Sequence, residues 1–71
     1  MNTVNPKKLL NSKWTAVNPQ NKEKHFLVVE VQYDEDQTVI SCAIEAIYSK
    51  QQQAIEWPDL KNNKLWRQGW V

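Results

Sequence analysis

The chain has 71 residues and a net charge of +1, with four Trp, one Cys and one Gly. A chain of this length forms one domain that buries only about 60% of the surface its unfolded form exposes, so its core is small and depends on large aromatic side chains. The near-zero net charge excludes a global electrostatic attraction to nucleic acid or membranes, and the single Cys excludes an internal disulfide.

Cysteine usage also bears on the compartment. Small secreted domains are normally cross-linked by several disulfides, which Cys42 alone cannot provide. The longest apolar run in residues 1–13 is Leu9-Leu10, far shorter than the apolar part of a signal peptide or a membrane span. We therefore expect a cytoplasmic protein with no membrane partner.

Residues 1–12 are polar and contain an Asn-Pro pair, which predicts a loose N-terminal arm ahead of a single Trp-rich β domain over residues 13–71. Residues 13–17 favour β structure and place Trp14 and Ala16 on one face, which predicts a first strand. We expect this strand to end at Asn18-Pro19, because the residue before a proline is pushed out of regular pairing.

The clearest strand pattern covers residues 24–33. Apolar side chains alternate there, with Leu27 and Val29 among those on one face and Phe26 and Val28 on the other. Residues 34–37 form a polar connection of hairpin length before the next apolar run. The stretch 25–48 holds five acidic residues and no Lys or Arg, a charge block expected to face solvent or an opposite charge.

Residues 38–49 satisfy two periods. Ile40, Cys42 and Ile44 alternate as in a strand, whereas Ile40, Ala43, Ile44 and Ile47 also fit a helical stripe. The early β-branched residues and the short hairpin connection favour a strand, while the Ala residues and the following Gln-Gln-Gln favour a helix. A strand followed by a turn at residues 49–52 is the interpretation adopted, and a helix remains the alternative.

The C-terminal third predicts short elements. Residues 54–57 suggest a strand with Ile55 and Trp57 on one face, ended by Pro58, and residues 59–63 suggest a turn or one helical turn. Gly69 can adopt the positive φ that would fold Trp70 back onto the sheet. The predicted fold class is therefore all-β: a small antiparallel meander or SH3-like open barrel of four to five strands, with a C-terminal Trp-containing turn.

The sequence offers little for enzyme chemistry. A dyad of Cys42 and His25 is conceivable across the hairpin, but the strand face that Cys42 shares with Ile40 and Ile44 is typical of a core thiol. One Cys and one His do not make a zinc site, and one Gly does not make a phosphate-binding loop. We therefore expect no catalytic residue, no metal and no cofactor.

Cations and aromatic rings mix toward the C-terminal end. Single-strand binding proteins use this mixture, because bases stack on the rings while cations follow the phosphates. The structural alternative is a core role, since Trp is mostly buried and the stems of Lys and Arg often cover its ring. The candidate binding residues are Lys24, His25, Trp57, Lys61, Lys64, Trp66, Arg67 and Trp70.

The strings KWTAVNPQNKEKHF, CAIEAIYSK, IEWPDLK and WRQGW resemble a family of small bacterial tryptophan-rich proteins of unknown function, of the DUF2389 type. The likeness spans residues 13–70. Its marks fall on Trp14, Lys22, Glu23, Lys24, His25, Phe26, Trp57, Leu60, Trp66, Gly69 and Trp70. The resemblance implies no activity, cofactor or catalytic residue.

The expected function is that of a non-enzymatic interaction module. Such a module would present Trp57, Trp66 or Trp70 beside the basic candidates to a protein or peptide partner. Binding of single-stranded RNA or DNA by the same surface is the alternative. An exposed edge strand could also pair two copies into a homo-oligomer.

Overall fold

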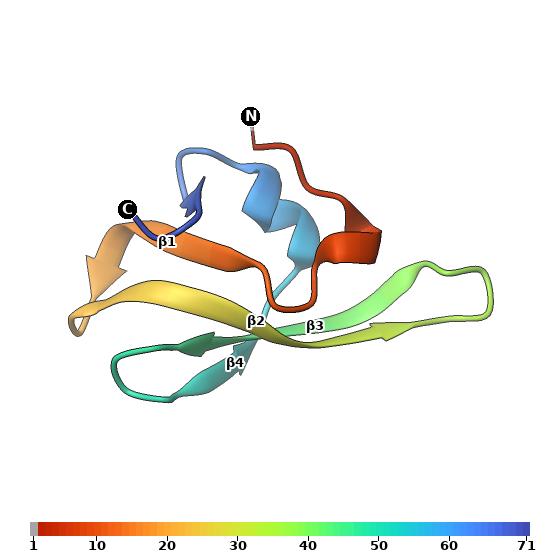
Figure 1. Cartoon of the computed structure of the whole chain (residues 1–71), viewed down its shortest axis with the longest axis horizontal. Helices are drawn as coiled ribbons and strands as arrows, with labels where there is room; N and C mark the ends of the chain where they lie inside the picture. Colours follow the sequence, from red (N-terminus) through yellow and green to blue (C-terminus); the bar gives the residue numbers. More distant parts are fainter. Residues whose placement is uncertain (1) are drawn as a thin grey trace.

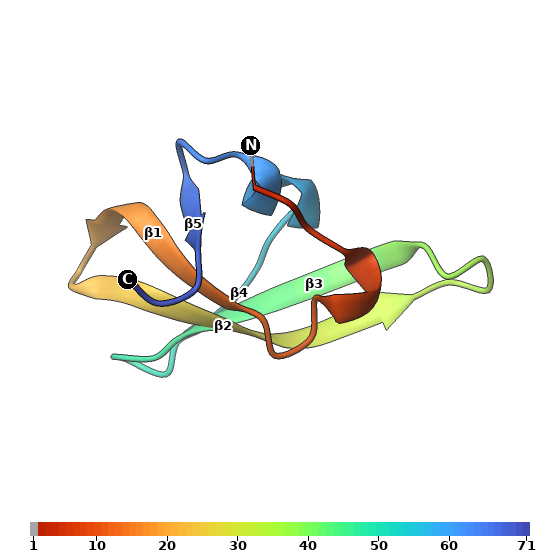
Figure 2. The same ribbon diagram turned by 45° about the horizontal axis from the view of Figure 1, so that its top comes forward.

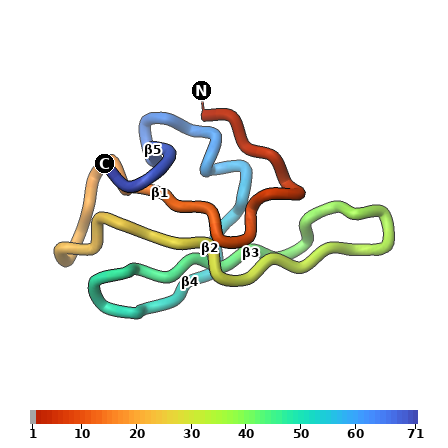
Figure 3. The backbone as a smooth tube through the Cα atoms, in the orientation of Figure 1, coloured from red at the N-terminus to blue at the C-terminus, as the bar shows by residue number. Residues whose placement is uncertain are grey.

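A computed structural model describes residues 2–71 and contains one open antiparallel sheet of five strands in the order β4-β3-β2-β1-β5 (Figure 1). Two short 3-10 helices, η1 (Pro6–Lys8) and η2 (Trp57–Lys61), accompany the sheet on the same side (Figures 1 and 3). The predicted all-β class is confirmed, and so is the Trp-containing turn near the C-terminal end.

Strands β1 (Lys13–Gln20) and β2 (Glu23–Tyr33) form a hairpin whose two turn residues, Asn21 and Lys22, both have positive φ angles of 54° and 64°. Such a turn matches the natural twist of the two strands. The expected end of the first strand at Asn18-Pro19 is wrong, because β1 continues to Gln20. Proline is tolerated there because the pairing with β2 is irregular between Thr15 and Gln20.

Strand β3 (Val39–Ala46) pairs with β2, so the ambiguous segment forms a strand over these residues. Its connection to β2 is stabilised by the Asp34 carboxylate, which accepts backbone N–H groups of Asp36 and Thr38 at 2.9 Å each. The register shifts between Val28 and Glu30, and this bulge changes which alternate residues of β2 face inward.

Because of the bulge, residues from both predicted faces of β2 pack into the core. Phe26 and Val28 are buried before the bulge, whereas Val31, expected on the other face, packs against the core after it. A second shift lies between Gln32 and Tyr33, opposite Ile40, whose side chain is 63% exposed. Strict alternation therefore fails at two positions, each occupied by an extra residue.

Strand β4 (Gln52–Ala54) lies upstream of the strand expected at residues 54–57. Trp57 instead begins η2, with Pro58 in the first turn of that helix. This correction has a simple cause: proline has no N–H to donate, and the first turn of a helix leaves its N–H groups without intrahelical partners. Leu60 of η2 is fully buried against the sheet.

Strand β5 (Trp66–Gln68) pairs with β1, so the first and last strands of the chain lie side by side at one edge of the sheet (Figure 2). Residues 2–12, expected as a loose arm, lie against this part of the domain; residue 1 of that arm is outside the described residues. The Asn2 side chain donates to the Leu60 and Trp66 carbonyls at 2.9 and 2.7 Å, and Leu9 is only 1% exposed. The polar composition of the segment gives no indication that Leu9 is buried.

The core is a small cluster of eight apolar residues. They come from the N-terminal segment, the three central strands and η2, and one face of the sheet carries most of them. We call this face the inner face and the opposite one the outer face. The core residues are Leu9, Trp14, Phe26, Val28, Cys42, Ile44, Ala46 and Leu60.

Candidate functional site

The four tryptophans fall into two groups according to their indole N–H. Trp14 is 3% exposed and donates to the Ser12 hydroxyl at 2.8 Å, and Trp70 donates to the Phe26 carbonyl at 2.9 Å. Within residues 2–71, no such bond is found for Trp57 or Trp66. No side-chain nitrogen or oxygen of the described residues is both buried and unpaired, so these two N–H groups are open to solvent.

The outer face carries the segment 69–71, which we call the C-terminal clasp. Gly69 has the predicted positive φ, at 78°, and the chain beyond it turns back over β1 and β2. The Thr15 hydroxyl, buried beneath it, donates to the Gly69 carbonyl at 2.7 Å and accepts from the Val71 N–H at 3.1 Å. These bonds fix the clasp to β1.

Two predicted site residues, His25 and Trp70, meet at the clasp. Their ring centroids are 5.9 Å apart, and His25 Nε2 lies 3.0 Å from the Val71 carbonyl oxygen. The Lys13 ammonium lies 4.9 Å from the Trp70 ring centroid, as in a cation–π contact. Sequence reasoning missed Lys13, which reaches Trp70 only because β1 pairs with β5.

The other predicted residues are spread around the domain. Arg67 stands opposite Thr15 and therefore shares the outer face with His25. Lys61 lies over the Trp57 ring, 4.9 Å from its centroid, within η2. Lys24 and Lys64 are exposed, whereas Trp66 is half-buried opposite Ala16 on the inner face. The candidate set therefore does not form one continuous surface.

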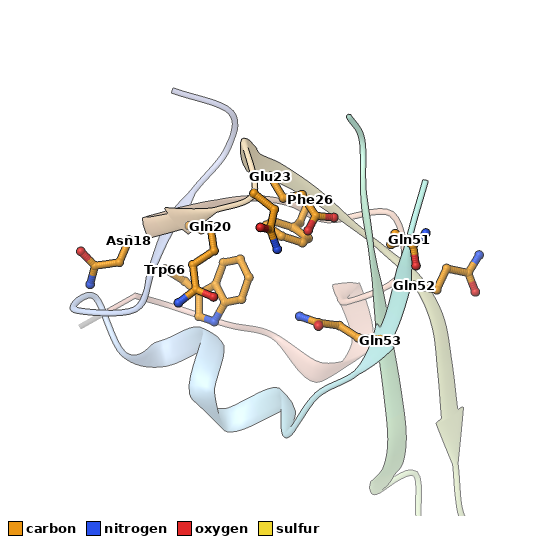
Figure 4. A pocket seen from close by; sticks show the side chains of 10 residues that line it. Asn18, Gln20, Glu23, Phe26, Gln51, Gln52, Gln53 and Trp66 are labelled. Carbon is orange, nitrogen blue, oxygen red and sulfur yellow. The ribbon is translucent and has the colours of Figure 1, made fainter. Parts of the chain in front are cut away.

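The inner face contains a groove of about 520 Å³ beside Trp66, which we call the amide groove (Figure 4). Phe26 and Trp66 provide its aromatic wall, with ring centroids 5.2 Å apart and planes nearly perpendicular at 88°. Figure 4 shows Gln53 of β4 pointing across the groove toward the indole. The amide residues that line the groove are Asn18, Gln20, Asn21, Gln51, Gln52 and Gln53, of which Gln52 turns its side chain away to Glu45 on the outer face.

The groove carries little charge. Glu23 is its one lining carboxylate among the described residues, and that carboxylate accepts a hydrogen bond from the Ser49 hydroxyl. Each amide side chain offers both donors and an acceptor. The groove is therefore suited to a ligand rich in neutral hydrogen-bonding groups, and its negative charge disfavours a phosphate chain.

Sequence reasoning missed the amide residues of the groove. The only signal is the presence of two amide-rich runs: residues 18–21 follow the predicted first strand, and residues 51–53 begin within the turn predicted at residues 49–52. The curvature that brings these runs to opposite sides of Trp66 is a property of the whole sheet. Local patterns carry no information about it.

Cys42 and His25 lie on opposite faces of the sheet. Cys42 is 2% exposed in the core, where burial raises the pKa of its thiol, while His25 is in the row with Thr15 on the outer face. The conceivable dyad is therefore not assembled. Residues 2–71 contain no group of three or more His, Cys, Asp or Glu side chains arranged to hold a metal ion.

The fold and the grooved inner face define a small all-β domain with tryptophans on both sides of one open sheet. A family model described as Tryptophan-rich protein (DUF2389) matches residues 12–71, and the chain belongs to this family of unknown function. No curated protein and no solved structure matches the chain. Over the part described by the structure, no helix is long and apolar enough to cross a membrane.

Proposed function

We propose that this domain is a non-enzymatic interaction module of the bacterial cytoplasm, and that it binds a protein or peptide segment in the amide groove. The observation that carries the proposal is Trp66, which lines the groove with Phe26 and several amide residues and whose indole N–H is not buried without a partner. The bacterial cytoplasm is supported by the family resemblance and by the single, buried Cys42.

The groove has the composition of a peptide site. A peptide main chain alternates N–H and C=O groups, and amide side chains can pair with both. An apolar side chain of the peptide can pack on the Trp66 ring, a residue type that often dominates binding energy at interfaces. A groove volume of about 520 Å³ accommodates a few residues of such a segment.

The test uses a phage-displayed library of random twelve-residue peptides, selected on the immobilised domain. Selected peptides should bind wild type and the exposed control variant Gln32→Ala equally, and should bind Gln53→Ala about three- to tenfold more weakly, as expected for one lost neutral hydrogen bond. Enrichment no better than on a surface without domain, or equal binding to both variants, would contradict the proposal.

A second candidate function, binding of single-stranded nucleic acid, is favoured by the clasp. Trp70 is 41% exposed, and Lys13, His25 and Arg67 surround it or share its face. A base could stack on the exposed part of the Trp70 ring while the cations contact phosphates. This site is on the outer face and is thus distinct from the amide groove.

A fluorescein-labelled fifteen-residue oligo(dT) tests the second candidate. Binding should weaken steeply between 20 and 200 mM NaCl, because neutralised phosphates release counterions, and the double variant Lys13→Ala/Arg67→Ala should remove it. The groove variant Gln53→Ala is the matched control and should bind like wild type. No binding at 20 mM NaCl would eliminate this function.

A further inference from the structure

Strand β4 is an edge strand with one unused side. On its other side β4 is bonded to β3. The Ile55 N–H donates to the Cys42 carbonyl, and the Ala46 N–H donates to the Gln51 carbonyl, each at 2.9 Å. Because backbone groups alternate in direction along a strand, the N–H and C=O groups of Gln52 and Ala54 point away from β3. No further strand of residues 2–71 lies on that side.

The unused side of β4 adjoins the amide groove. Gln53 pairs with the fully buried Ile44, so its side chain is on the inner face and points into the groove, whereas Gln52 pairs with Glu45 on the outer face. A strand added to β4 would sit about 4.8 Å away and would also alternate its side chains between the two faces. Every second side chain would therefore face Phe26 and Trp66.

The other edge of the sheet is occupied. The Asn2 side chain donates to the Trp66 carbonyl of β5, and the Gln68 side chain donates to the Thr3 carbonyl. The N-terminal segment thus covers β5. Since β4 has no such cover in the described residues, the two edges differ in their readiness to accept a strand.

Charge indicates the chemistry of the partner. Glu45 lies on the outer face beside Gln52 and accepts its amide N–H at 2.9 Å, and β3 belongs to the stretch 25–48, which has five acidic residues and no Lys or Arg. Glu23 lines the groove on the inner side. An incoming strand with Lys or Arg on its outer face complements this charge.

We infer that the partner is an extended peptide segment that joins the sheet as a sixth strand beside β4. Its apolar side chains enter the amide groove, and the alternate side chains are basic and face Glu45. This inference rests on the proposed peptide-binding function and adds the binding mode and the sequence pattern of the ligand. Main-chain pairing supplies the affinity, and the groove supplies the selectivity.

The probe is the heptapeptide acetyl-TKVKVKT-amide, titrated into isotope-labelled domain and followed by amide NMR shifts. Shifts should be largest at Gln52, Gln53 and Ala54, and should be small around Thr15 on the outer face. The acidic counterpart acetyl-TEVEVET-amide should bind at least fivefold more weakly, because it places like charge beside Glu45. Equal affinity for both peptides would overturn the predicted basic pattern.

Backbone methylation tests the strand pairing itself. Methylating the main-chain nitrogens of the three lysines removes one alternating set of N–H groups, and methylating those of the two valines removes the other. Methylation of one set should abolish binding, and methylation of the other should leave binding nearly unchanged. If the peptide pairs antiparallel to β4, the lysine set is the sensitive one; if it pairs parallel, the valine set is. Equal sensitivity of the two sets would overturn strand addition.

A variant of the domain provides the matching test. Ala54→Pro removes an N–H that the fold does not use and should weaken the heptapeptide at least tenfold while the domain stays folded. Gln53→Pro removes an N–H that faces β3 and should instead destabilise the domain. If peptides bind the groove but Ala54→Pro binds like wild type, strand addition fails and the proposed function stands; if no peptide binds, both fail.

Discussion

Trp66 and Trp70 are four residues apart in the chain and have opposite relationships to their surroundings. Trp70 lies on the outer face, where its N–H is bonded to the Phe26 carbonyl and its ring is flanked by Lys13 and His25. Trp66 lies on the inner face with its ring nearly perpendicular to that of Phe26, lines the amide groove, and has no hydrogen bond from its N–H within residues 2–71. One ring closes the fold, and the other leaves a donor free.

The comparison shows that exposure alone is a poor guide to function. Trp70 is the more exposed of the two, at 41%, yet its polar atom is already satisfied within the domain. The half-buried Trp66 retains hydrogen-bonding capacity beside the amide groove. The free N–H is therefore a stronger sign of a ligand site than the area of ring that water can reach.

The largest effect is expected at Phe26, which serves both regions: its ring contacts Trp66 and its carbonyl accepts the Trp70 N–H. Phe26→Ala should lower the free energy of unfolding by about 3–5 kcal/mol, a large part of the roughly 4–11 kcal/mol expected for 71 residues. Urea unfolding followed by circular dichroism measures this. Phe26→Leu, which keeps most of the volume, should cost clearly less; equal losses in the two variants would contradict a loss that depends on the volume removed.

A smaller loss is expected when the clasp is released. Thr15→Val keeps the shape of the side chain but removes both hydrogen bonds to the clasp, which should cost about 1–3 kcal/mol. Hydrogen exchange should accelerate at the Val71 amide and stay unchanged in β3. Thr38→Val, at an exposed hairpin position, is the control and should change stability by less than about 0.5 kcal/mol.

The two indole N–H groups can be compared directly by phenylalanine substitution. Trp70→Phe removes an N–H that makes a hydrogen bond. It should therefore lower the free energy of unfolding by about 0.5–1.5 kcal/mol beyond the loss caused by the smaller ring, whereas Trp66→Phe loses no hydrogen bond of the described residues. The order should reverse for peptide binding, which only Trp66→Phe should weaken. A Trp70→Phe variant as stable as wild type would remove the distinction between the two regions.

The smallest effect concerns Cys42, which reports on the core. Burial raises the pKa of its thiol above that in the unfolded chain, so its contribution to stability is fully present below the ordinary thiol pKa of 9.0 and is lost as pH rises through the folded value. The free energy of unfolding should therefore fall slightly faster above pH 9 than in Cys42→Ala. Thiol labelling should stay slow in Thr15→Val under native conditions, if the clasp opens without the core.

Local patterns predicted much of the fold. The alternation in β2 and β3 away from their two bulges, the polar hairpin at residues 34–37 and the positive φ of Gly69 are all properties of neighbouring residues, and the structure has each of them. The bulges beside Val28 and at Ile40 were not predictable, because an extra residue in a strand is defined by its partner strand. Pro58 led to a wrong prediction for a different reason: proline is compatible both with the end of a strand and with the start of a helix, and here it lies in the first turn of η2.

The site was less predictable than the fold. His25 and Trp70 are brought together as residues of one predicted set, but Lys13 and the amide residues of the groove joined the site only through pairings between distant segments. Arg67 and Trp66 are adjacent in sequence and face opposite sides of the sheet. A cluster of suitable residue types in the sequence therefore becomes a surface only after the strand register is known.

The pairing of β1 with β5 also has a consequence for synthesis. Trp14 stands opposite Gln68, so one edge of β1 has no partner until nearly the entire domain has left the ribosome. The β2–β3 hairpin joins neighbouring residues and can form early, whereas closing the β1–β5 pair requires a long loop and is intrinsically slower. During that interval the nascent chain exposes a strand edge and the apolar surface around Trp14, the features that make a partly folded domain prone to aggregate.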